Sequence, residues 1–390
     1  MTAEEKIVYL DNAATTFPKP ETVYSSMDSF YRNFGGNAGR GANPLARKSA
    51  SLIDDTRLML CTWLNAPSVV FAPSATIALN TIIMGARLRA GDVVYVTPFE
   101  HNSILRPLEY LRQTVGIQVH VLPFDKNTLE CKLENVKKLF RLYPPKLMCM
   151  TQISNVLGLV IPVDELALMV KQISPNCITL VDGAQAAGLY HLDMSNIDAQ
   201  VWSGHKSLYG PYGIAGIAFG TNWRPDLLIR GGTGTVSESI EMPEDGPSRF
   251  EAGSHNISAV AGLNAALKWL NEIGAGIINN HTRSLTEHLY NMLFGLPNVT
   301  TYLPDNRNML GGIVSFSIKG VKPQTIETLL GAENVAVRAG LHCSPWAHDF
   351  IGSIQHGGTV RVSLGYYNSS SEIASFLTKI AKIVKSSSGE

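Results

Sequence analysis

Lys206 stands alone among uncharged residues in the stretch VWSGHKSLYGPYG, which runs from Val201 to Gly213. No Lys, Arg, Asp or Glu lies within seven residues on either side of it, and a short apolar segment comes directly before it. A lysine in a solvated loop usually has charged neighbours. When a lysine is desolvated and set among polar groups, the pKa of its amine shifts readily. Such a lysine is suited to nucleophilic chemistry. The pattern therefore indicates a reactive lysine.

Polar side chains also follow the apolar runs that precede Lys206 in the sequence. In chain order these positions are Ser74, Ala75 and Thr76, then His101, Asn155, Asp182, Gln185, Ser203 and His205. If the apolar runs are parallel strands, their carboxyl ends meet at one edge of the sheet, where α/β proteins bind ligands. We therefore expect these residues to share one site with Lys206.

One end of this predicted site is suited to an anion. Ser74, Ala75 and Thr76 open a helix, whose first N–H groups are unpaired and carry partial positive charge, and the two hydroxyl groups add donors. An ordinary helix N-cap explains the same residues. Ser203 and His205 follow a neighbouring strand and are expected to reach the same anion.

Asp182 is the second charged group of the predicted site, and it ends the apolar run CITLVD. A carboxylate there is costly unless it is paired, so it caps a helix, binds a metal or pairs with the cationic nitrogen of a heterocycle. A phosphate, a basic ring nitrogen and an aldehyde that reacts with Lys206 together describe pyridoxal 5'-phosphate. In that hypothesis Gln185 bonds the ring hydroxyl and His101 stacks on the ring.

Short apolar runs alternate with helix-like segments between about residues 68 and 220. The runs cover 68–72, 92–98, 146–152, 177–182 and 199–204, and the segment GAQAAG follows the fourth of them. This alternation is typical of an α/β domain with a mainly parallel sheet covered on both faces. The C-terminal third has a long amphipathic helix at 258–274 followed by further strands, which indicates a smaller α+β domain. The Gly-rich and acidic stretch 231–249 is expected to be a functional loop.

Composition excludes several other classes of protein. The chain has 390 residues, 45% of them apolar, and 32 basic residues balance 32 acidic ones, which does not favour a nucleic-acid or membrane-surface partner. No apolar run approaches the roughly 20 residues that span a bilayer, and the N-terminus lacks the pattern of a secretory signal. Five cysteines without a CxxC pair favour a reduced, cytoplasmic protein.

The motifs of this chain resemble those of the cysteine desulfurases of the class V aminotransferase fold, in particular the group that includes selenocysteine lyases. The resemblance runs in order from residue 9 to about 366 through YLDNAATT, EHNSI, SNVLG, VDGAQAAG, SGHKSLYGPYGIA, RFEAGSHN and RAGLHCSPW. It implies pyridoxal phosphate fold type I, a homodimer, a large domain at 16–259, and a small domain made of 1–15 and 260–390.

The resemblance also assigns roles to individual residues. Lys206 matches the Schiff-base lysine, Asp182 the partner of the ring nitrogen, and Gln185 and His101 the ring-contacting residues. The phosphate ligands match Ser74, Ala75, Thr76, Ser203 and His205, with Ser254 reaching over from the other subunit. The residues that hold the substrate match Asn155, Arg361 and Ala13. Gly39 and Asn43 depart from the family, whose members often have histidines nearby.

Cys343, in RAGLHCSPW, matches the loop cysteine that takes the sulfur atom from the substrate as a persulfide. Arg338 and His342 lie close to it in the sequence, and a nearby cation raises the thiolate fraction of a cysteine. The other cysteines, in apolar stretches, are expected to be buried. The predicted reaction converts L-cysteine to L-alanine and delivers sulfur to an acceptor protein or thiol.

Four alternatives are kept open. The first is a selenocysteine lyase that acts on L-selenocysteine, and the second is an aminotransferase or lyase in which Cys343 has no role. The third is a metal site among residues 342–356, formed by His342, Cys343, His348, Asp349 and His356, although their spacing matches no standard zinc pattern and no metal is expected. The fourth is a scaffold that keeps the fold without catalysis.

Overall fold

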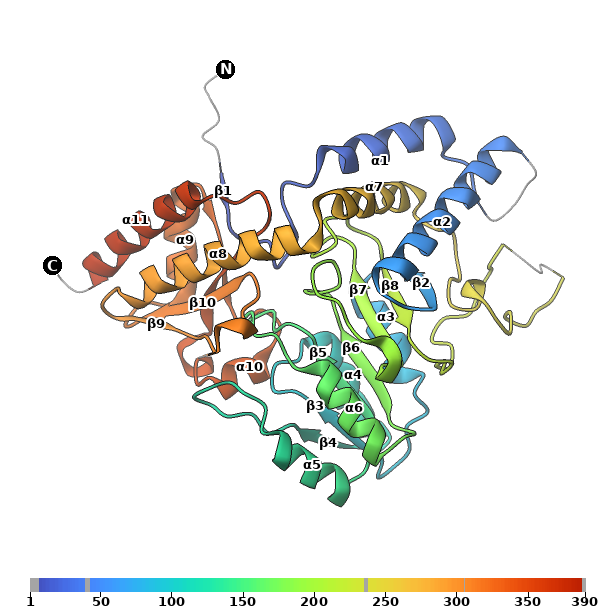
Figure 1. Cartoon of the computed structure of the whole chain (residues 1–390), viewed down its shortest axis with the longest axis horizontal. Coiled ribbons are helices and arrows are strands. Elements are labelled where there is room, and N and C mark those ends of the chain that lie inside the picture. Colours follow the sequence, from blue (N-terminus) through green and yellow to red (C-terminus); the bar gives the residue numbers. More distant parts are fainter. Residues whose placement is uncertain (1–6, 39–42, 235–237, 305, 388–390) are drawn as a thin grey trace.

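The computed structural model describes residues 7–38, 43–234, 238–304 and 306–387, and their strands form three sheets (Figure 1). The largest sheet has seven strands, and its middle strands are parallel, as predicted. In spatial order its strands are β2 (Ser68–Ala72), β8 (Ala215–Phe219), β7 (Ala199–Ser203), β6 (Ile178–Asp182), β5 (Pro145–Thr151), β3 (Val93–Val96) and β4 (Gln118–Val121).

Helices cover both faces of this sheet, because successive apolar residues of a strand point to opposite sides. In β2, Val69 and Phe71 belong to one core cluster, whereas Val70 belongs to the other. The first cluster includes residues of α2 (Pro44–Trp63), α5 (Leu133–Leu142), α6 (Val163–Ile173) and α7 (Ile257–Ile273). The second includes residues of α3 (Ala75–Met84) and α4 (Asn102–Thr114). Helix α1 (Glu21–Phe34) packs on α7.

The remaining elements form a smaller unit of sheet and helices, on the left in Figure 1. An antiparallel sheet of four strands has the order β12 (Arg338–Gly340), β13 (Thr359–Ser363), β10 (Ile313–Ile318) and β9 (Val299–Thr301). Its helices are α8 (Ala275–Phe294), α9 (Pro323–Ala332), α10 (Pro345–Phe350) and α11 (Ser370–Ser387). Short 3-10 helices occupy Met194–Asn196, Pro247–Arg249, Arg307–Met309 and Ile354–His356.

The N-terminal segment joins this smaller unit. Strand β1 (Val8–Tyr9) pairs in parallel with β11 (Val335–Ala336), and Asp11 forms a bridge with Ser363 at the end of β13. Leu10 is fully buried in the third core cluster, among residues of β10, β13 and α11. The division into 16–259 and 1–15 with 260–390 stays a prediction. Residues 1–6 of it lie outside the described residues, and α7 packs within the core of the large sheet.

The structure differs from the sequence-based expectation in local detail. The segment GAQAAG, residues 183–188, forms turns rather than a helix. Strands β4 and β8 and helix α5 were not predicted, and β8 lies antiparallel between β7 and β2. Since β8 is antiparallel to both of its neighbours, β2 and β7 run in the same direction. The carboxyl end of β2 therefore lies at the same sheet edge as that of β7. Among the described residues, no helix combines the length and apolarity needed to cross a membrane.

Candidate active site

A pocket of about 200 Å³ lies at the carboxyl edge of the large sheet. Ten of the residues singled out in the sequence line it: Ser74, Ala75, Thr76, His101, Asn155, Asp182, Gln185, Ser203, His205 and Lys206. They come from the ends of five strands, and the turns after those strands aim them at a common space. The structure therefore brings together the side chains that the strand pattern predicted to meet.

Lys206 and Asp182 provide the charged groups of this pocket. Burial lowers the pKa of Lys206, and the carboxylate of Asp182 acts in the opposite direction. The amine therefore holds its proton less firmly than an exposed lysine does, which makes it a better nucleophile and base. Asp182 is 6% exposed, and its Oδ1 accepts a hydrogen bond from the backbone N–H of Ala184 at 2.9 Å. This bond fixes the carboxylate at the end of β6.

His101 is held in one orientation and one protonation state. Its Nδ1 accepts the backbone N–H of Ser103 at 3.0 Å, so His101 caps helix α4. Because Nδ1 accepts, a neutral ring carries its proton on Nε2. Burial lowers the pKa of His101, which favours the neutral ring. The Ser103 hydroxyl also contacts Nδ1 at 2.9 Å and Thr76 Oγ1 at 2.9 Å, and it was not foreseen from the sequence.

Donors for an anion gather at the N-terminus of α3. Ser74 caps this helix by accepting the N–H of Ile77 at 3.3 Å. Ser203 and His205 face the same pocket, and the buried Nδ1 of His205 has no partner among the described residues. Burial, reinforced by the charges of Lys206 and Lys19, lowers the pKa of His205 to about 4, so the ring is neutral near pH 7. A neutral imidazole with an unpartnered nitrogen beside a helix N-terminus fits a phosphate group.

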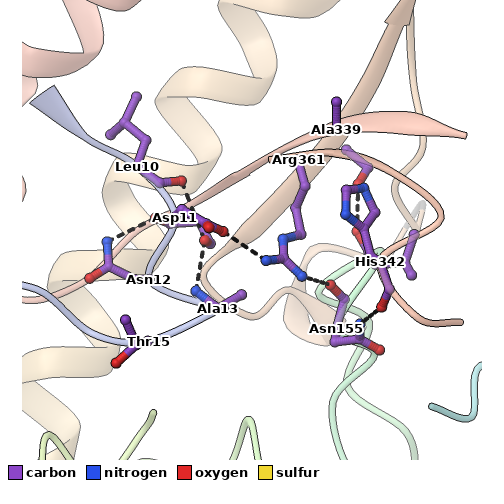
Figure 2. A network of polar contacts seen from close by, with 12 residues as sticks. Leu10, Asp11, Asn12, Ala13, Thr15, Asn155, Ala339, His342 and Arg361 are labelled. Carbon is purple, nitrogen blue, oxygen red and sulfur yellow. Dashed lines mark hydrogen bonds and ion pairs between the residues drawn. The ribbon is translucent and has the colours of Figure 1, made fainter. Parts of the chain in front are cut away.

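Arg361, on β13, forms the centre of a buried polar network (Figure 2). Its side chain is 3% exposed, Nη1 donates to the Asn155 carbonyl at 2.9 Å, and Nη2 forms an ion pair with Asp11 Oδ1 at 2.8 Å. The Nε atom is buried and has no partner among the described residues. A guanidinium with unused donor capacity suits a carboxylate ligand. Asp11 was missed because it lies 350 residues from Arg361 in the sequence.

The Asn155 side chain contacts the turn that carries Cys343. Its Nδ2 donates to the carbonyl of His342 at 2.7 Å, and its Oδ1 accepts from the hydroxyl of Ser344 at 2.8 Å. Nδ2 carries a second N–H, which these two hydrogen bonds leave available for the predicted contact with a substrate carboxylate. Asn155 therefore stays a predicted substrate ligand, with a second set of partners that the sequence did not reveal.

Ala13 acts through its backbone. Its carbonyl accepts from Gln185 Nε2 at 2.8 Å, and its N–H donates to Ser363 Oγ at 2.8 Å. Ala13 thus ties the N-terminal segment both to the pocket wall and to the end of β13. Its predicted substrate contact stays a prediction.

Cys343 is exposed, in contrast to the other four cysteines. Cys149 and Cys177 are buried as expected, whereas Cys61 and Cys131 are only partly buried against the core. Burial raises the pKa of Cys131 and of Cys177 to about 12, and it also raises the pKa of Cys61. These thiols remain protonated near pH 7 and are poor nucleophiles. Cys343 is therefore the most accessible of the five thiols.

Ser254 does not line the pocket that holds Lys206. It lies on a separate cavity of about 790 Å³ together with Arg57, Glu251 and His255. The buried Glu251 pairs with Arg57 at 2.5 Å and with His255 at 2.7 Å, and this cluster fixes the backbone around Ser254. The predicted approach of Ser254 to the site of a second subunit stays a prediction.

The structure bears on the alternative metal site and on one of the two positions that depart from the family. Among the described residues, no three His, Cys, Asp or Glu side chains come together to share a metal ion, so the alternative metal site at 342–356 is not formed. Of the two positions that depart from the family, Gly39 lies outside the described residues. Asn43 caps helix α2 by accepting the N–H of Ala46 at 3.0 Å.

Glu100 is a buried carboxyl group directly before His101, and no sequence pattern singled it out. Its Oε1 accepts the N–H of Thr97 at 3.3 Å, the hydroxyl of Thr97 at 2.7 Å and the N–H of Thr151 at 2.9 Å. These bonds join the ends of β3 and β5. Burial nevertheless raises the pKa of Glu100 to about 8, so its proton is retained near pH 7.

Glu100→Gln is expected to stabilise the protein more at pH 8 than at pH 6. The pKa of Glu100 is about 8 in the folded chain, against 4.5 for the free group, so the unfolded chain loses this proton first and stability falls as the pH rises between these values. Glutamine keeps an accepting oxygen and does not titrate. The melting temperature of the variant minus that of the wild type should grow by about 2–5 °C between pH 6 and pH 8. The exposed control Glu134→Gln, on α5, should show no such trend, and an equal shift for both would contradict the prediction.

The chain matches the family model described as "Aminotransferase class-V" over residues 8–376. It is 33% identical to a probable cysteine desulfurase of Methanothermobacter thermautotrophicus, over 94% of this chain and 92% of that one. It is 30% identical to a probable cysteine desulfurase of Pyrococcus abyssi, over 98% of this chain and 95% of that one. A solved apo structure of a cysteine desulfurase from Thermococcus onnurineus is similar with a TM-score of 0.88 and 29% identity, covering 97% and 95% of the two chains. The α/β fold with its mainly parallel sheet is thereby confirmed, and the chain belongs to the class V aminotransferase family.

Proposed function

We propose that this chain is a pyridoxal-phosphate-dependent cysteine desulfurase, which converts L-cysteine to L-alanine and transfers the sulfur atom to Cys343. One observation carries the proposal. Lys206 and Asp182, from the ends of adjacent strands, line one pocket, and the exposed Cys343 lies on a turn that is hydrogen-bonded to Asn155, another residue of this pocket. The relatives, which are named as probable cysteine desulfurases and align with this chain over most of their length, support the same activity.

The pocket fits the proposed cofactor. Its phosphate would lie at the N-terminus of α3, held by Ser74, Thr76, Ser203 and the unpartnered Nδ1 of His205. Asp182 would hold a proton on the ring nitrogen, and His101 would contact the ring with a fixed neutral imidazole. Gln185 would offer its amide to the ring hydroxyl. When bound, pyridoxal phosphate supplies a carbonyl carbon that reacts with amines and a ring that withdraws electrons from the substrate carbon atoms.

The residues around the pocket would then divide the work on L-cysteine. Arg361 would bind the substrate carboxylate with the donors that Asp11 and Asn155 leave unused. Lys206, whose lowered pKa favours the free amine, would take the proton from Cα. A positioned base of this kind accelerates proton transfer by roughly 10²–10⁴-fold. Arg361 and Lys206 thus fix the substrate and move its proton.

The sulfur atom would pass to Cys343 in one displacement. The Cys343 thiolate forms a sulfur–sulfur bond with the substrate sulfur as the bond from that sulfur to Cβ breaks. The electron pair of the broken bond stays with carbon, which takes up a proton, and the product leaves as alanine. The enzyme keeps the sulfur as a persulfide on Cys343, and a thiol or a sulfur-acceptor protein removes it. The exposure of Cys343 supports such a transfer.

We also propose that the enzyme is a homodimer in which Ser254 completes the partner's phosphate site. The support is that the cavity holding Ser254 is open and is separate from the pocket of its own chain. The absence of a disulfide among the described cysteines agrees with a reducing, cytoplasmic compartment.

Purified protein loaded with pyridoxal phosphate is expected to release alanine and sulfide from L-cysteine in equal amounts when a reducing thiol is present. Chromatography of the amino acid and a colorimetric assay of sulfide measure both products. A keto acid in place of alanine would contradict the proposal and favour an aminotransferase. A parallel assay with L-selenocysteine compares the two substrates through their kcat/KM values.

A further inference from the structure

The turn that carries Cys343 adopts a backbone that its residues do not favour. His342 has φ of 48° and Cys343 has φ of 58°, so both lie in the left-handed region, although neither is glycine. Such conformations persist where surrounding contacts over-determine them, and they are found at functional sites. The contacts that hold this turn therefore decide where the thiol lies.

Three hydrogen bonds attach the turn to the wall of the pocket. Asn155 Nδ2 donates to the carbonyl of His342 at 2.7 Å, and the Ser344 hydroxyl donates to Asn155 Oδ1 at 2.8 Å. The backbone N–H of Asn102, the first residue of α4, donates to the carbonyl of Cys343 at 2.7 Å. All three consecutive residues of the turn are thus held, while the thiol itself remains exposed.

Asn155 is itself rigidly placed. Its loop closes on itself, because the N–H of Ser154 donates to Leu159 at 2.9 Å and the N–H of Gly158 donates to Ser154 at 2.9 Å. The Asn155 carbonyl accepts from Arg361 at 2.9 Å, so one residue contacts both the guanidinium group and the turn of Cys343 (Figure 2). Asn155 thus links Arg361, through its backbone carbonyl, to the turn of Cys343, through its side-chain amide.

We propose that Asn155 and Ser344 are positioning residues, which hold the thiol of Cys343 at a fixed place relative to Arg361. We call the three hydrogen bonds that hold residues 342–344 the clamp. The expected effect on catalysis rests on the proposed desulfurase function, whereas the clamp itself does not depend on that function. Ser344 is the better residue to test, because Asn155 is also a predicted ligand of the substrate carboxylate.

Ser344→Ala removes one hydrogen bond of the clamp and leaves Arg361 untouched. The matched control is Ser353→Ala: both serines are fully buried in the same region, and the Ser353 hydroxyl contacts His348 Nδ1 at 2.7 Å rather than Asn155. In the cofactor-loaded enzyme, Ser344→Ala should lower kcat by about fivefold to tenfold, the effect of one lost hydrogen bond, with an unchanged KM. Ser353→Ala should change neither.

A second measurement does not require activity. The N–H of Asn102 is protected by the carbonyl of Cys343, so its hydrogen exchange reports whether the turn stays in place. Residue-resolved mass spectrometry should show exchange at Asn102 accelerated by about fivefold to tenfold in Ser344→Ala and unchanged in Ser353→Ala.

The two measurements test the clamp and the desulfurase function separately. Equal exchange at Asn102 in both variants overturns the clamp, and faster exchange with unchanged kcat overturns its positioning role. A rise in KM alone would also overturn it, since that would place the effect on substrate binding. If the wild type does not turn over cysteine, the desulfurase function fails, and the exchange experiment still tests the clamp.

Discussion

Replacing Lys206 with alanine is expected to abolish turnover of L-cysteine and the visible absorption of the bound cofactor together. The amine would serve both as the covalent attachment point of pyridoxal phosphate and as the base at Cα, and the base alone accounts for roughly 10²–10⁴-fold in rate. No other lysine lines the pocket within the described residues, so no neighbour replaces it. The absorption spectrum and the rate of alanine formation measure the two effects.

The control for this variant is Lys138→Ala, which removes an exposed lysine on α5. It should keep both the spectrum and the rate. Borohydride reduction of the wild type, followed by peptide mapping, should locate the cofactor on the peptide that contains Lys206. Location on another lysine, or a Lys206→Ala protein that keeps its colour and its rate, would refute the assignment.

Replacing Cys343 with alanine is expected to separate cofactor binding from sulfur transfer. The variant keeps Lys206, Asp182 and the phosphate ligands, so its absorption spectrum should match that of the wild type. Turnover of L-cysteine should fall by at least about a hundredfold, because the nucleophile for sulfur is gone. The other thiols are buried or partly buried, and none replaces Cys343.

The matched variant for this test is Cys61→Ala, which removes a partly buried thiol of α2. It should turn over cysteine at the rate of the wild type. Iodoacetamide should label Cys343 first in the wild type and should inactivate it. If Cys343→Ala made alanine from cysteine at an undiminished rate, the proposed persulfide would be wrong, and an activity without a role for this cysteine would be favoured.

The sequence was sufficient for the parts of the site that follow from strand pattern. Lys206, Asp182 and His101 each come at or directly after an apolar run, and parallel pairing brings the ends of such runs to one edge. That rule needs no knowledge of side-chain contacts. It placed ten residues in one pocket, because the runs really are strands of a mainly parallel sheet.

The parts that the sequence did not reveal depend on contacts between distant segments. Asp11 and Arg361 meet only because the segment after β1 forms a bridge with Ser363 at the end of β13, and nothing near either residue indicates the other. The left-handed backbone at Cys343 is equally hidden, since non-glycine residues rarely adopt it. Strand β4 is short and largely exposed, so its apolar pattern is weak.

The pairing of β1 with β11 has a consequence for synthesis on the ribosome. Val8 is synthesised long before its partner Val335, and Asp11 long before the guanidinium of Arg361 that holds it. The strands of the large sheet, β2 to β8, can pair before β13 is made, whereas the proposed site of the substrate carboxylate needs both β13 and the segment that carries Asp11. Nascent chains that stall before β13 would contain Lys206 but lack Arg361, and under the proposed function we expect them to be inactive.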